Sequence, residues 1–279
     1  MLEEQGALAE AEAAYRRADE RGHGSAASDL GRLLEEQGAL AEAEAAYRRA
    51  DERGDADGAF RLGVLLAERG ALDQAADAYG RASGRGHNTA AVDLGVLLAE
   101  HGELAAAEAA FGRADERGDA IAASNLGVLL EERGALAEAE AAYRRADERG
   151  DADGAFRLGV LLAERGALDQ AADAYGRASG RGHNTAAIEL GILLAEHGAL
   201  AEAEAAFGRA DERGDGAAAF NLGVLLEERG ALAEAKAAYR RAEERDDGEG
   251  ASMARAALLD LGQEIEDTSA RRDMQAQNV

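Results

Sequence analysis

The sequence predicts an all-α protein: a right-handed α-solenoid, or superhelix, built from antiparallel helix pairs. The main observation is a 32-residue period in which the dipeptide Leu-Gly recurs without a slip in register, and such self-similarity is typical of a linear stack of repeats. Within each period, apolar residues follow helical spacing, and no alternating β-branched run indicates a strand. The copies of the dipeptide begin at Leu30, Leu62, Leu94, Leu126, Leu158, Leu190 and Leu222.

The first half of each unit predicts one helix. In the segment ADGAFRLGVLLAERG, the apolar residues between Phe60 and Leu66 fit one helical face, and Gly70 is a natural C-terminal stop. We expect Asp55, or Asn88 in the following copy, to cap this helix, because each side chain stands within two residues of the Gly that ends the preceding segment.

The second half predicts a partner helix that ends at Gly86 and carries Ala75 and Tyr79 on its apolar stripe. Gly63 lies in the middle of the first helix, where Gly costs about 1 kcal/mol relative to Ala, so we expect a close approach there. The aromatic residues occupy only two slots, of which we expect the second-helix slot to be core. That slot holds Tyr15, Tyr47, Tyr79, Phe111, Tyr143, Tyr175, Phe207 and Tyr239, and the other holds Phe60, Phe156 and Phe220.

The repeat also predicts how the chain is organised. We expect an unpaired N-terminal helix at 1–22, seven helix-pair repeats at 23–245, a C-terminal capping helix at 246–267 and a disordered tail at 268–279. In the capping helix, Leu258, Leu259 and Leu261 are expected to point inward. Residues 38–133 and 134–229 differ at only eight positions, which indicates that three units were duplicated as a block.

Composition argues against several functions. A net charge of −25 opposes binding to nucleic-acid phosphates and favours basic partners. The chain contains no Cys, which removes disulfides and Cys nucleophiles and suits the reducing cytoplasm, where we expect the protein. The start MLEEQGALAE has no signal-peptide pattern, and no stretch reaches the roughly 20 apolar residues that span a membrane. The excess of Ala, Gly and Arg indicates GC-rich, bacterial coding.

The order of small and aromatic residues resembles the tetratricopeptide repeat from residue 2 to about residue 245. The residues that carry the resemblance in one unit are Leu62, Gly63, Gly70, Ala75, Tyr79 and Ala82. The connection ADERGDADGAFRLG is similar instead to the end of a Sel-one-like repeat. The tetratricopeptide unit is two residues longer, and its usual Pro is missing here. The resemblance implies a helix-pair solenoid that serves as an adaptor, without implying a particular ligand.

No motif indicates catalysis. The sequence has no Walker-type loop, HExxH or Gly-x-Ser-x-Gly pattern. Its carboxylates are too numerous to mark one acid/base pair. The His residues stand near helix ends and not at metal-ligand spacing. We therefore expect no enzyme activity, no cofactor and no metal.

Three slots on the first helix form the candidate partner-binding site. By analogy with the resembled families, they border the concave inner groove and give it an apolar floor with an acidic edge. They hold Phe60, Val64, Glu68, Val96, Glu100, Ser124, Val128, Glu132, Phe156, Val160, Glu164, Ile188, Ile192, Glu196, Phe220, Val224 and Glu228. Some tetratricopeptide proteins hold acidic peptides with a Lys and Asn clamp, but Phe60 and Val64 occupy two of its places.

An alternative is that this Glu row only pairs with an equally regular row of Arg. That row is Arg49, Arg81, Arg113, Arg145, Arg177, Arg209 and Arg241. A free Glu row would favour a cationic ligand, whereas a paired row would be structural.

The leading hypothesis for function is therefore a non-enzymatic scaffold that binds a basic, partly apolar peptide or helix on its concave face. The alternative is a structural protein that self-assembles end to end into dimers or filaments through an exposed N-terminal face, led by Leu2, Leu8 and Tyr15. A third hypothesis is an accessory module of an enzyme whose catalytic domain lies elsewhere.

Overall fold

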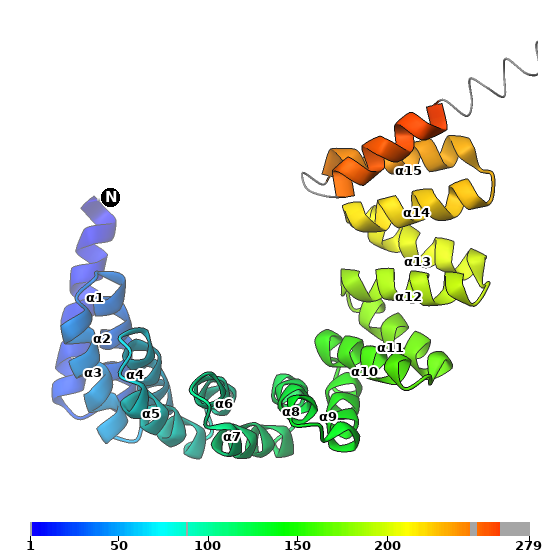
Figure 1. Ribbon diagram of the computed structural model, residues 1–279. Coiled ribbons are helices and arrows are strands. Elements are labelled where there is room, and N and C mark those ends of the chain that lie inside the picture. Colours follow the sequence, from blue (N-terminus) through cyan, green and yellow to red (C-terminus); the bar gives the residue numbers. More distant parts are fainter. Residues whose placement is uncertain (1, 88, 246–249, 263–279) are drawn as a thin grey trace, which may run out of the picture. The chain divides into compact units, whose positions relative to one another are not determined.

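A computed structural model describes residues 2–87, 89–245 and 250–262, with side chains from residue 8 onward, and all regular structure in those ranges is α-helical (Figure 1). The chain divides into two compact units, Met1–Arg149 and Gly150–Val279. The first contains α1 (Leu2–Glu20), α2 (Gly24–Glu36), α3 (Leu40–Glu52), α4 (Ala56–Glu68), α5 (Leu72–Gly84), α6 (Ala90–Glu100), α7 (Leu104–Glu116), α8 (Ala120–Glu132) and α9 (Leu136–Glu148). The second contains α10 (Ala152–Glu164), α11 (Leu168–Gly180), α12 (Asn184–Glu196), α13 (Leu200–Glu212), α14 (Gly216–Glu228) and α15 (Leu232–Arg245), followed by helical residues 250–262.

The helices pack as the repeat predicts. Each even-numbered helix, the first helix of a repeat, packs against the odd-numbered helix that follows it, as in α4 with α5. First helices of successive repeats also contact one another, in the pairs α2 with α4, α6 with α8, and α12 with α14. The prediction of an all-α repeat solenoid is confirmed. The surface that the first helices share within each unit is called here the first-helix face.

Glycine follows each helix from α1 to α14 because the turn requires a positive φ. Among the described residues only Gly adopts positive φ, for example 73° at Gly70 and 90° at Gly86. The amide of Gly70 donates to the Ala67 carbonyl at 2.9 Å, and the amide of Ala71 donates to the Leu66 carbonyl at 2.9 Å. These bonds satisfy the last carbonyls of the helix and reverse the chain direction.

The predicted cap at Asp55 is confirmed, because its carboxylate accepts a hydrogen bond from the Gly58 amide at 2.7 Å. Asn88 lies outside the described residues. The duplicated copy carries Asn184 at the corresponding position. Asn184 lies within the first turn of α12, and the preceding His183 caps the helix, its Nδ1 accepting from the Ala186 amide at 3.1 Å. The imidazole nitrogen thus occupies the acceptor position that Asp fills elsewhere.

The aromatic slot of the second helix is core, as predicted. Tyr143 on α9 has no exposed surface, and its ring lies where a Cβ on Gly127 of α8 would come within 2.5 Å of Cδ1 and Cε1. Mid-helix Gly therefore makes room for the aromatic ring of the same repeat. The Tyr143 hydroxyl donates to Glu131 Oε2 at 2.6 Å, and Tyr47 donates to Glu35 in the same way. The partial exception is Tyr15, which is half-buried.

Buried aspartates connect successive second helices. Asp51 near the end of α3 accepts hydrogen bonds from Arg81 and Arg85 of the next repeat, at 2.7 and 2.6 Å. Burial alone would raise the pKa of this carboxyl, but the two guanidinium partners outweigh it and lower the pKa below 3.8. We call this arrangement a joint. It recurs at Asp19 with Arg49 and Arg53, at Asp115 with Arg145 and Arg149, and at Asp211 with Arg241 and Arg245.

Two joints carry Ser in place of Asp. At Ser83, Arg117 donates to the hydroxyl at 3.2 Å. At Ser179, Arg213 donates to the backbone carbonyl at 3.3 Å and to Asn184 Oδ1 at 2.9 Å. The buried Ser179 hydroxyl has no hydrogen-bond partner among the described residues. These joints therefore lack the carboxylate that two arginines share elsewhere.

The last described helix, residues 250–262, packs its Ala254 and Leu261 completely out of solvent. Leu258 is half-buried. Leu259 contradicts the expectation that it points inward. Its side chain is 65% exposed, because it is adjacent to Leu258 on the helix and so faces another direction. The remainder of the expected capping helix, 246–249 and 263–267, and the expected tail at 268–279 lie outside the described residues.

Candidate functional site

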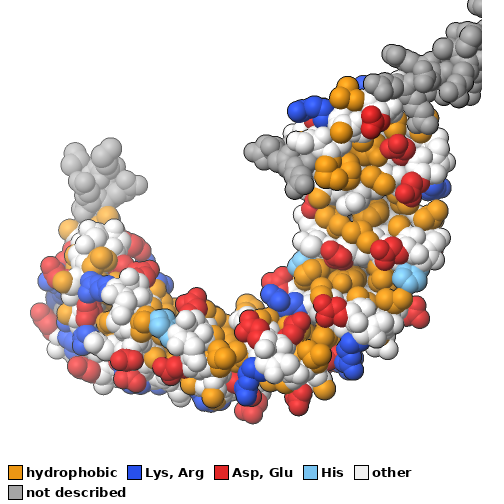
Figure 2. All heavy atoms as spheres, viewed as in Figure 1, with side chains coloured by type: hydrophobic (Ala, Val, Ile, Leu, Met, Phe, Trp, Pro, Cys, Tyr) orange, Lys and Arg blue, Asp and Glu red, His pale blue; other side chains and the backbone are white. Residues whose placement is uncertain are grey.

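The predicted site residues lie on the first-helix face at four-residue spacing, so those of one helix share one side. Over α12 and α14, Figure 2 shows hydrophobic surface interspersed with acidic side chains. The exposed members are Glu68, Val96, Glu100, Glu132, Glu164, Ile192, Glu196 and Glu228. The half-buried members are Phe60, Val64, Val128, Phe156, Val160, Ile188, Phe220 and Val224. Apolar side chains therefore lie low on this face, with carboxylates beside them.

The expectation that Ser124 contacts a partner is not supported. Its side chain is only 6% exposed, because a small residue at this slot lies beneath its neighbours, whereas Phe at the same slot extends further. The adjacent Asn125 is half-buried instead and lines the surface there.

The pairing of the Glu row with the Arg row is wrong. Arg49, Arg81, Arg145 and Arg241 bind the buried joint aspartates, on the second-helix side of the repeats. Glu36 pairs with Arg32 at 2.8 Å. The other six, Glu68, Glu100, Glu132, Glu164, Glu196 and Glu228, have no ion-pair partner within the part of the chain that the structure describes. Their charges are therefore available to an external cation.

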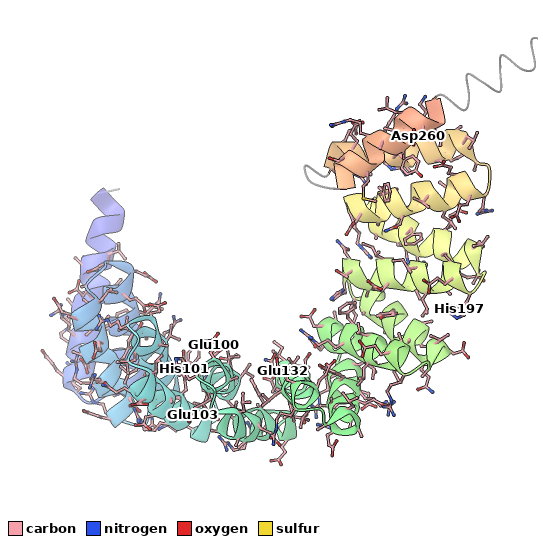
Figure 3. All side chains as sticks on the ribbon, viewed as in Figure 1. Glu100, His101, Glu103, Glu132, His197 and Asp260 are labelled. Carbon is pink, nitrogen blue, oxygen red and sulfur yellow. The ribbon has the colours of Figure 1, made fainter. Side chains whose placement is uncertain are left out.

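A cavity of about 180 Å³ lies between α6 and α8 in the first unit. Phe111, Val96, Val128 and Leu129 supply its apolar lining, together with Ala99. Glu100, Glu132 and Asn125 complete the lining, and Figure 3 places Glu100 on α6 and Glu132 on α8.

The sequence predicted the Val and Glu residues of this cavity but not Ala99, Phe111, Asn125 and Leu129. The available signal was that Phe replaces Tyr in the second-helix slot only where the first helix carries Ala99 or Ala195.

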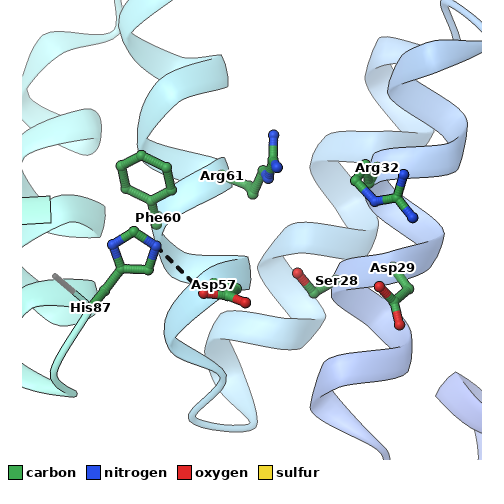
Figure 4. A pocket seen from close by; sticks show the side chains of 7 residues that line it. All are labelled: Ser28, Asp29, Arg32, Asp57, Phe60, Arg61 and His87. Carbon is green, nitrogen blue, oxygen red and sulfur yellow. Dashed lines mark ion pairs between the residues drawn. The ribbon is translucent and has the colours of Figure 1, made fainter. Parts of the chain in front are cut away.

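A second cavity, of about 200 Å³, lies between α2 and α4 and is mainly polar (Figure 4). Its lining includes Asp29, Arg32 and Arg61. Phe60 is not free here, since the His87 ring stacks on it with centroids 4.1 Å apart. His87 Nε2 also lies 3.4 Å from a carboxylate oxygen of Asp57.

The same triple of Asp, Phe and His recurs in the second unit. Phe156 stacks on His183 at 4.4 Å, and His183 Nε2 lies 3.3 Å from Asp153. Phe60 and Phe156 therefore pack against the start of the next repeat. Phe220 stacks on no His among the described residues.

A tetratricopeptide repeat family model matches residues 28–88, 92–155 and 188–251, which together are more than half of the chain. The chain belongs to the tetratricopeptide repeat family. Repeats of this family are generally non-enzymatic scaffolds for protein or peptide partners. No curated protein sequence matches the chain significantly.

Two solved structures with TM-scores of 0.50 or more show the same fold, and a third is similar to the chain. The crystal structure of yeast Tom70 matches with a TM-score of 0.54 and 13% identity over 96% of this chain and 62% of that one. A Sel1 repeat protein from Oxalobacter formigenes matches with a TM-score of 0.50 and 24% identity over 62% of this chain and 77% of that one. The protective antigen c5321 of uropathogenic Escherichia coli, with an SLR fold, has a TM-score of 0.44 and 24% identity over 88% and 65%. This tetratricopeptide chain spans less than two thirds of the first and third of these proteins.

Across the described residues, no three His, Asp or Glu side chains converge as metal ligands would. In the same ranges no helix has the length and apolarity needed to cross a bilayer.

Proposed function

We propose that this tetratricopeptide array is a non-enzymatic scaffold that binds a basic, partly apolar peptide or helix on its first-helix face. The observation that carries the proposal is the row of six exposed glutamates without a cation partner among the described residues. This row runs beside half-buried Val, Ile and Phe side chains. A segment that alternates apolar and cationic side chains matches both features.

The joints strengthen the electrostatic argument. Nearly all cations of this chain are Arg, and the joints hold many of them on the second-helix side. The glutamates of the first-helix face are thus left without internal neutralisation in a chain of net charge −25. Complementary charge chiefly raises the association rate and specificity, while burial of apolar side chains supplies most of the affinity.

The test uses a fluorescein-labelled synthetic peptide of alternating Leu and Arg, with binding followed by anisotropy at several salt concentrations. Changing Glu164, Glu196 and Glu228 to Gln should weaken binding and flatten its salt dependence, because exposed charges are screened by salt. The matched control changes the same number of exposed glutamates on second helices. Those are Glu202, Glu212 and Glu234. Equal effects of the two sets would refute binding on the first-helix face.

The apolar contribution is tested separately. Ile192→Ser and Val224→Ser remove apolar surface from α12 and α14 without altering charge. These variants should weaken binding by a similar factor at low and high salt, because salt does not screen the hydrophobic contribution. Phe156 is unsuited to this purpose, since it also packs on His183.

Self-association is the second candidate, and the half-buried Tyr15 favours it, since the equivalent aromatics of later repeats are buried. Leu8 adds nothing to this case. It is 46% exposed, and the equivalent Leu40 and Leu136 are 42% and 43% exposed. Sedimentation velocity of the full chain and of Tyr15→Ser over a wide concentration range tests the idea. A strict monomer in both would dispose of it.

A further inference from the structure

We infer that the cavity between α6 and α8 is an anchor site for one aliphatic side chain, such as Leu, Ile or Met, in a segment that carries Arg or Lys next to it. The inference rests on the proposed function and makes it specific. It assigns a single pocket, a side-chain class and a neighbouring cation.

The cavity is open because of two residues. In three other repeats the second-helix aromatic is Tyr with Glu opposite it, as where the Tyr47 hydroxyl donates to Glu35 Oε2 at 2.6 Å. In two more it is Tyr with Ala opposite it, at Tyr79 with Ala67 and at Tyr175 with Ala163. At this repeat, Phe111 stands in place of Tyr47 and Ala99 in place of Glu35. The polar pair that would fill the space is therefore absent, and the ring of Phe111 lines the cavity.

Its size and lining favour an aliphatic group. A volume of about 180 Å³ in a cavity that opens to solvent leaves room for one aliphatic side chain to enter from outside. Val96 is 39% exposed and Phe111 only 3%, so the lining passes from a buried ring to an accessible Val. An apolar side chain that enters here leaves water and meets apolar atoms, which is favourable in proportion to the area buried.

Its acidic edge specifies the neighbours of that side chain. Glu100 and Glu132 also line the cavity, from the two adjacent first helices, and neither has an ion-pair partner among the described residues. The side-chain amide of Asn125 likewise makes no hydrogen bond within the described part of the chain and is available to a peptide backbone. Charge complementarity therefore selects a partner segment with cations beside the anchor.

The duplicated block repeats most of this arrangement in the second unit. There α12 and α14 contact each other and carry, in the corresponding slots, Ile192, Ala195, Glu196, Asn221, Val224, Leu225 and Glu228, while α13 carries Phe207. Two differences make the second copy less complete. The Asn221 amide donates to the Ala217 carbonyl of its own helix at 3.0 Å. Phe220 replaces the buried Ser124.

The experiment compares two fluorescein-labelled peptides that differ at one central residue, Leu or Ala, between flanking arginines. The full chain should bind the Leu peptide about tenfold more tightly, the factor expected for partial burial of the extra methylene groups. The decisive variant is A99E/F111Y, which copies the Glu35 and Tyr47 arrangement of this same chain and closes the cavity.

The variant adds a carboxylate, so electrostatic attraction alone would tighten binding of both peptides. If the cavity is the anchor site, the preference of A99E/F111Y for the Leu peptide over the Ala peptide should fall to about twofold. Binding of the Ala peptide should be retained or strengthened. Val96→Ser, which leaves the helices unchanged, should reduce the preference severalfold. The corresponding A195E/F207Y variant measures how much of the preference for the Leu peptide comes from the second copy of the arrangement, on α12, α13 and α14. Far-UV circular dichroism and the thermal midpoint verify folding.

An undiminished Leu preference in both A99E/F111Y and Val96→Ser would overturn the anchor site. Failure of the proposed function has a different signature: neither peptide would lose affinity when Glu100 and Glu132 are changed to Gln together with Glu164, Glu196 and Glu228, whatever the ratio of the two affinities.

Discussion

Replacing the mid-helix Gly127 with Ala should destabilise the protein, although Ala is the better helix former. A Cβ at this position would lie 2.5 Å from Cδ1 and Cε1 of Tyr143, closer than real carbon atoms approach. The ring cannot retreat easily, because it is fully buried and its hydroxyl is bonded to Glu131. Overpacking of this kind typically costs about 1–3 kcal/mol.

Gly112 on α7 is the matched control, since an added Cβ meets nothing within 4 Å there. Both substitutions gain about 1 kcal/mol of helix propensity. Gly112→Ala should therefore raise the free energy of unfolding by about 1 kcal/mol. The free energy of unfolding of Gly127→Ala should be about 1–3 kcal/mol lower than that of Gly112→Ala.

Urea unfolding followed by circular dichroism at 222 nm measures both variants against the unmodified chain. Because a repeat array can unfold in parts, amide hydrogen exchange of α8 and α9 gives a local value. If both variants stabilise equally, Tyr143 does not depend on the absence of a Cβ at Gly127, and the reasoning is refuted.

Four further outcomes follow from the core and the joints. Tyr143→Ala should cost about 3–5 kcal/mol, and an unchanged unfolding midpoint would contradict its burial. Ser179→Asp should stabilise at neutral pH by about 1 kcal/mol, since it offers Arg209 the carboxylate present at other joints; no gain in thermal midpoint would argue against this. Asp51→Asn should lose stability at pH 7, but the loss should shrink as pH falls below about 4, because the folded pKa of Asp51 is depressed. The pKa of Asp93 shifts in the opposite direction, because burial raises it despite an opposing contribution from His87. Asp93→Asn should therefore stabilise at pH 7 and lose that advantage near pH 3, as urea midpoints at both values would reveal.

Much of the fold could be predicted because the repeat restates each local signal several times. Gly at helix ends, Leu-Gly in the first helix and the aromatic slot of the second all have local physical meanings. The close approach at Gly63 was predicted correctly because Gly is unfavourable in the middle of a helix unless a neighbour needs the space. The structure identifies that neighbour as the ring of Tyr79.

The joints could not be predicted for a reason that also comes from the repeat. Every row of residues in a periodic sequence has the same spacing, so regularity alone does not say which acidic row an Arg row meets. Arg81 lies 30 residues after Asp51 and also close in sequence to other carboxylates. Only the packing of one second helix on the next decides the pairing. The cavity was missed for a related reason, since it arises from an absence of side-chain atoms at Ala99 and Phe111.

The joint makes each repeat self-contained for recombination. Outside the two repeats with Ser83 and Ser179, a repeat supplies a carboxylate to its successor and two guanidinium groups to its predecessor, so such a 32-residue segment carries both halves of the connection. An in-frame duplication or deletion of such whole repeats therefore joins an acceptor to its donors. Chains of this design can change length without evolving a new interface each time.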